Sequence, residues 1–75
     1  MNNTHYAVIN EENDVVAVVK KENLQPRVIS AIEDETGSGV ESLLIMEDKD
    51  GLLKVKATLN DQFDYTALLK PTWEY

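Results

Sequence analysis

One stretch of the chain, residues 23–37, has the pattern of a helix, and no other stretch does. Asn23 is a residue type that favours the N-cap, Pro26 falls within the first turn, and Gly37 favours a left-handed end. Between them the apolar residues recur at the spacing of one helix face: Leu24, Val28, Ile29 and Ile32. A single helix must therefore cover whatever the flanking segments build.

Those flanking segments are rich in β-branched residues and contain period-two alternation, which predicts strands. The expected strands are residues 6–10, 15–19, 40–47, 52–59 and 63–70. Asp50-Gly51 is a strong signal for a hairpin turn, and Pro71 is expected to end regular pairing or mark an edge. The sequence therefore predicts an α+β protein, a two-layer sandwich in the order β-β-α-β-β-β, with one helix packed on a mostly antiparallel sheet.

The 75 residues are expected to form one small domain, with tails at residues 1–4 and 71–75. A chain of this size buries only about 60% of its unfolded surface. It has no cysteine, so it offers no disulfide and no thiolate metal site. The first residues have neither the basic nor the apolar region of a signal peptide, and the longest apolar run is far shorter than the ~20 residues that span a bilayer. We therefore expect a cytoplasmic protein with no membrane partner.

The formal charge of −7 disfavours direct binding of nucleic acid, because phosphates are bound by Lys and Arg. If successive elements alternate in direction, seven acids fall at one end of the domain, and no Lys or Arg shares those turns. This predicted acidic rim consists of Glu11, Glu12, Asp14, Glu33, Asp34, Glu35 and Asp61. Three of the seven lie at the negative end of the helix macrodipole, where negative charge is unfavourable. An unfavourable feature without compensation suggests a function, so one hypothesis is that the rim binds a basic protein partner. The simpler alternative is that these charges only keep the protein dissolved.

The predicted sheet has more apolar residues than one face needs. Apart from residues 52–59, the strands have apolar residues at both parities, and one helix covers one face only. We expect the second face to form a homodimer interface, with Val16, Val18, Leu44 and Met46 as its candidate residues. The alternatives are a sheet that curls into a barrel, or a C-terminal tail with Trp73 and Tyr75 that covers the face.

No catalytic, cofactor or metal site is predicted. His5 is the only histidine, so the serines lack a base and a metal lacks a second imidazole. Asp48-Lys49-Asp50-Gly51 resembles part of a calcium loop but lacks the later ligands of an EF-hand.

The expected function is therefore that of a non-catalytic protein-interaction domain that self-associates through its open sheet face. The alternative is an acidic inhibitor, or nucleic-acid mimic, that binds a basic protein. Salt distinguishes the two, because binding by a charge mimic collapses at high salt and a sheet contact does not.

Overall fold

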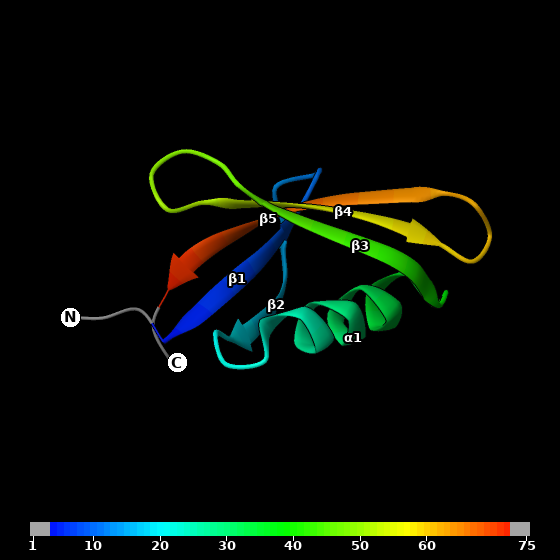
Figure 1. Ribbon diagram of the computed structural model, residues 1–75, viewed down its shortest axis with the longest axis horizontal. Helices are drawn as coiled ribbons and strands as arrows, with labels where there is room; N and C mark the ends of the chain where they lie inside the picture. Colours follow the sequence, from blue (N-terminus) through cyan, green and yellow to red (C-terminus); the bar gives the residue numbers. More distant parts are fainter. Residues whose placement is uncertain (1–3, 73–75) are drawn as a thin grey trace.

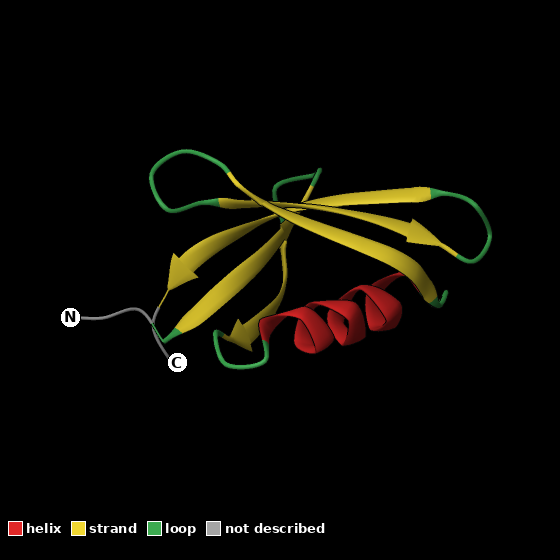
Figure 2. Cartoon of the chain, in the orientation of Figure 1, coloured by secondary structure: helices red, strands yellow, loops and turns green. Residues whose placement is uncertain are grey.

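The computed structural model describes residues 4–72 and contains one helix and five strands in the predicted order (Figure 1). The elements are β1 (His5–Asn10), β2 (Val15–Lys20), α1 (Leu24–Thr36), β3 (Val40–Glu47), β4 (Leu53–Leu59) and β5 (Asp64–Thr72). The helix packs on one face of the sheet, so the predicted two-layer α+β class is confirmed (Figure 2). Trp73 and Tyr75, the alternative cover for the sheet, lie outside the described residues.

The five strands form one sheet in the order β2-β1-β5-β4-β3, and every neighbouring pair is antiparallel. Three of these pairings join strands that follow one another in the sequence. The fourth, between β1 and β5, joins the first strand to the last and aligns His5 with Thr72. The sheet is open rather than closed into a barrel, with β2 and β3 as its two edges.

The helix begins and ends at residues with a left-handed backbone. Gly37 has φ 74°, a conformation that costs glycine little, and its N–H donates to the Glu33 carbonyl at 2.8 Å. Asn23 precedes the helix as predicted but has φ 52°, and its side chain makes no capping hydrogen bond. The predicted N-cap is therefore confirmed, but Asn23 serves there through its tolerance of the left-handed backbone and not through a side-chain hydrogen bond.

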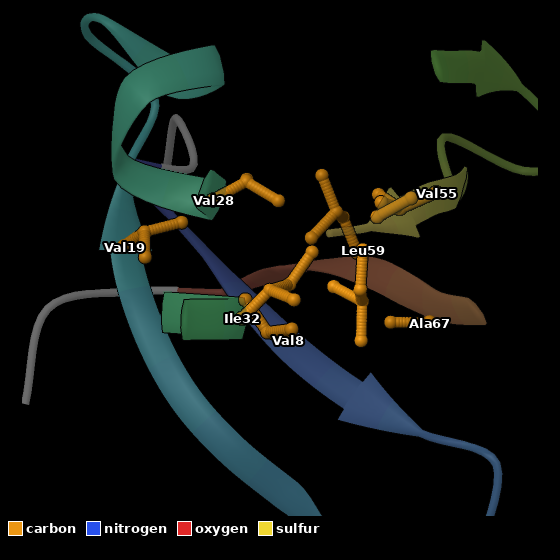
Figure 3. Close-up of a cluster of buried hydrophobic side chains, with 9 residues drawn as sticks. Val8, Val19, Val28, Ile32, Val55, Leu59 and Ala67 are labelled. Atoms are coloured by element: carbon orange, nitrogen blue, oxygen red, sulfur yellow. The ribbon is translucent and has the colours of Figure 1, made fainter. Parts of the chain in front are cut away.

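The core lies between α1 and the sheet. Val28 and Ile32, the buried residues of the helix, are one turn apart and point at the strands (Figure 3). On the sheet side Val8, Leu69 and Val55 are fully buried, and they come from the three consecutive strands β1, β5 and β4. Each such side chain stabilises the fold by about 1.5–3 kcal/mol relative to an exposed one. Val28 and Ile32 therefore pack α1 against the middle of the sheet.

A β-bulge interrupts the pairing of β1 with β2. Val8 lies opposite Ala17, whereas the next residue of β1 lies opposite Val15, so β2 has one extra residue, Val16. An extra residue shifts the alternation of faces beyond it. Val16 is half-buried and packs against the core, whereas Val18 is exposed. The expected placement of Val16 beside Val18 on one face is corrected by this bulge.

β5 runs further than predicted and includes Pro71, which lies opposite Tyr6 of β1. The pairing of β4 with β5 ends at Leu53 and Leu69, so beyond that point β5 is paired only with β1. The missing N–H of the proline therefore breaks no ladder hydrogen bond on the β4 side. Residues 71–72 belong to the strand rather than to a tail.

Candidate interaction surfaces

The sheet face opposite α1, here called the open face, exposes a group of large apolar side chains. They alternate along their strands with core residues such as Val19, Ile45 and Leu69. The exposed set is Val15, Val18, Leu44, Met46 and Leu68. Leu44 and Met46 are 52% and 44% exposed. Three of the four residues expected at a self-interface are thus on this face, and Val16 is not.

Lysines lie among these apolar residues. Lys54 of β4 is aligned with Met46 on one side and with Leu68 on the other. Lys56 lies two residues further along β4, and its ammonium nitrogen is 4.0 Å from the Asp64 carboxylate. Because both partners are more than half exposed, this ion pair adds little to stability. The open face therefore combines apolar surface with solvated positive charge.

Part of the predicted acidic rim gathers around one hollow of about 240 Å³. Glu11 and Glu12 reach it from the β1–β2 turn and Glu35 from the last turn of α1. Asp64 joins them from the start of β5. The Glu11 carboxylate also accepts a hydrogen bond from the Thr66 hydroxyl. The fold thus concentrates negative charge at this hollow.

Two rim residues hold neighbouring segments of the chain. Glu33 accepts a hydrogen bond from the Val40 N–H at 3.0 Å, where the chain passes from α1 into β3. Asp61 accepts hydrogen bonds from the Ser38 hydroxyl at 3.2 Å and from the Phe63 N–H at 3.3 Å. These carboxylates satisfy donors in two loops, which gives them a structural role.

The remaining two rim residues do not line the hollow. Asp34 lines a groove of about 680 Å³ between α1 and β2, together with Arg27 and Lys20. Successive helix residues are ~100° apart around the axis, so Asp34 faces away from its neighbours in the last turn. Asp14 is exposed in the first turn, where its N–H donates to the Asn10 side chain at 3.0 Å. The seven predicted rim residues therefore do not all line one hollow.

Sequence reasoning missed residues of both surfaces. Leu68 has the same parity in its strand as Thr66 and Lys70, so alternation alone could have placed it on the open face. Asp64 directly follows the turn that contains Asp61, so the argument that placed Asp61 at the acidic end applied to Asp64 too.

Among the described residues, Tyr65 has a polar group that is both buried and without a hydrogen-bond partner, the side-chain hydroxyl. Burial raises the pKa of this tyrosine above its usual value, and the negative charges of Glu35 and then Glu11 raise it further. The hydroxyl is therefore held neutral beside the acidic hollow.

Tyr65→Phe is expected to stabilise the domain by about 1 kcal/mol, because it removes a buried polar group that gains no hydrogen bond. A raised folded-state pKa means that the folded protein keeps a proton that the unfolded chain loses near pH ~10. The Tyr65 proton therefore contributes to the free energy of unfolding in full below pH ~10. That contribution is lost as the pH rises through the raised pKa of Tyr65. Midpoints of thermal unfolding between about pH 8 and 11 should fall less steeply for Tyr65→Phe. Equal slopes for the two proteins would contradict this.

No group of three or more His, Cys, Asp or Glu side chains within residues 4–72 is arranged to hold a metal ion. In the same part of the chain, α1 is too short and too polar to cross a bilayer. No family model, curated protein or solved structure matches this chain. The candidate surfaces must therefore be judged on their own chemistry.

Proposed function

We propose that the chain is a cytoplasmic, non-catalytic protein-interaction domain that self-associates through its open face. The observation that carries this proposal is the group of five large apolar side chains that α1 leaves exposed. Clustered apolar surface on a small domain is a common mark of a protein-binding site. The absence of cysteine is consistent with a reducing compartment.

The alternative is an acidic inhibitor that occupies a basic site on another protein. The hollow supports it, because four exposed acids line it: Glu11, Glu12, Glu35 and Asp64. Two observations favour self-association instead. Glu33 and Asp61 already bond within the chain, and Asp34 faces a different groove, so the acids do not form one phosphate-like array.

The test removes the two most accessible apolar residues of β3. The double variant Leu44→Ser and Met46→Ser should convert a dimer to a monomer, because both side chains would lose their buried contact. Light scattering over a range of concentrations measures the mass directly. The wild-type dimer should persist at high salt, since apolar contacts are not screened.

Phe63→Ser is the matched control. Phe63 is 70% exposed in the turn before β5 and is not on the open face, so this variant should remain a dimer. A wild-type protein that is monomeric at every concentration would refute self-association. A dimer that dissociates at high salt would favour a charge-based contact instead.

A further inference from the structure

The edge strand β3 presents backbone groups that have no partner strand. The Asp48 N–H donates to the Leu52 carbonyl at 2.8 Å, which fixes the phase of the β3–β4 ladder. Bonded and non-bonded pairs alternate in an antiparallel ladder, so every second residue of β3 directs its N–H and C=O away from β4. Because β3 ends the sheet, no strand of residues 4–72 lies beside these groups. The outward-facing residues are Leu43, Ile45 and Glu47.

The two edges of the sheet differ in how well they are protected. β2 contains the bulge at Val16, ends at the charged Lys20 and is followed by Lys21. In β3 the only shift of register lies before Ser42, and the stretch from there to Met46 is regular and uncharged. Bulges, prolines and charges are the usual devices that keep an edge strand from pairing. The regular part of β3 has none of them.

We propose that β3 pairs antiparallel with β3 of a second copy, about a two-fold axis at Ile45. This inference rests on the proposed function only in that the partner is a second copy. It narrows the contact from the whole open face to the β3 edge of that face, where Leu44 and Met46 lie. Leu44 then lies opposite Met46 of the second copy, and both side chains are on the open face. The outward groups of Leu43 pair with those of Glu47 of the second copy. Because β3 lies at the edge of the sheet (Figure 1), this pairing joins the two sheets into one. Leu44 and Met46 of both copies then form an apolar cluster at the junction.

Charge selects this register over its neighbours. With the axis at Ile45, Glu41 lies near Lys49 of the second copy, which is a favourable pair. Sliding one strand by two residues in one direction places Glu41 opposite Glu47 of the second copy, and like charges directly opposite are destabilising. Sliding in the other direction places Leu44 opposite Asp48 of the second copy. Of these three registers, the axis at Ile45 is the one that keeps Leu44 opposite an apolar residue and also places Glu41 beside a base.

Cross-linking tests the register, because the chain has no cysteine of its own. Two single variants are made, Leu44→Cys and Met46→Cys, at exposed positions that do not disturb the core. In the proposed dimer these positions form a non-bonded cross-strand pair, with Cα atoms ~4.5 Å apart, which suits a disulfide. Two copies of the same variant would have their cysteines ~7–8 Å apart on the diagonal.

A mixture of the two variants under mild oxidation should therefore form a disulfide heterodimer about tenfold faster than either variant forms a homodimer. Faster homodimers of Leu44→Cys or of Met46→Cys would identify one of the two shifted registers and overturn the proposal. Slow cross-linking in all three samples, with a wild-type dimer by light scattering, would refute the β3 contact and leave self-association standing. A wild-type monomer would refute both.

A proline substitution in the edge strand tests the backbone pairing of β3 in a second way. Glu47 is exposed and its N–H points away from β4. Glu47→Pro therefore removes a hydrogen-bond donor that is used only in the contact with the second copy. The variant should raise the dimer dissociation constant by about tenfold. Glu47→Ala, which keeps the N–H, should change it far less, and far-ultraviolet circular dichroism should show that both variants fold. Equal dissociation constants for the two variants would contradict pairing through this strand.

Val18→Ser distinguishes edge pairing from stacking of two open faces. Val18 is exposed on the open face, but in β2, the opposite edge of the sheet. Edge pairing leaves it uncovered, so this variant should cross-link through positions 44 and 46 as fast as the parent pair. A stacked dimer would bury Val18, so a markedly weaker dimer would overturn the edge contact.

Discussion

Leu69→Ala is expected to lower the free energy of unfolding by about 2–5 kcal/mol, whereas Leu68→Ala should lower it by less than about 1 kcal/mol. The two residues are adjacent in β5 and undergo the same chemical change. Leu69 is fully buried against α1 and its neighbours, so its truncation leaves a cavity. Leu68 is on the open face and 37% exposed, so solvent fills the space. Urea unfolding followed by circular dichroism measures both values.

The comparison tests the register of β5 as well as its burial. A shift of one residue exchanges the two faces of a strand, so a larger loss at Leu68 would show that the pairing of Leu69 with Val8 is wrong. Domains of this kind have only about 5–15 kcal/mol of stability. Leu69→Ala should therefore be studied at low temperature, where its folded fraction is still measurable.

Ile32→Ala should have an effect of similar size, about 2–5 kcal/mol. Ile32 is fully buried, and with Val28 it supplies the buried surface of α1 (Figure 3). Ile29→Ala is the matched control in the same helix, because Ile29 is only half-buried and should cost about half as much or less. Helix propensity cancels, since both variants exchange isoleucine for alanine.

Thermal unfolding monitored by circular dichroism gives the difference between these helix variants. Equal losses at the two positions would mean that the helix is rotated from its position in the structure, with Ile29 as deeply packed as Ile32. A loss at Ile32 of less than about 1 kcal/mol would mean that the sheet is stable without the cover of α1.

The fold class and most element boundaries follow from local signals in the sequence. Gly37 ends the helix because glycine accepts a left-handed backbone, and residues 40–47 were placed as they occur in β3. Alternation in β4 separated Val55 and Ala57 from Lys54 and Lys56, and the structure has them on those faces. Such signals act over a few residues, so they can be recognised in the sequence without knowing which strands pair.

Features that depend on contacts between distant segments cannot be predicted from local patterns in the sequence. The run Val15–Val19 is apolar at every position, so nothing in it marks Val16 as the extra residue of a bulge. The sequence predicts the acids of α1 together, but the helical twist places Asp34 in a different groove, which Lys20 and Arg27 also line. The order of strands was equally hidden, because the adjacency of β1 and β5 is a contact between the first and last strands.

The adjacency of β1 and β5 also dictates how this chain must close during folding. β1–β2 is one hairpin and β3–β4–β5 are two consecutive hairpins, and each group can form by local turns. The only ladder between the two sets aligns His5 with Thr72, so it must close a loop that contains nearly the whole described chain. Closing a long loop costs entropy before any long-range contact repays it. The slowest step of folding should therefore be the meeting of Val8 with Leu69, which completes the core and joins the two halves of the sheet.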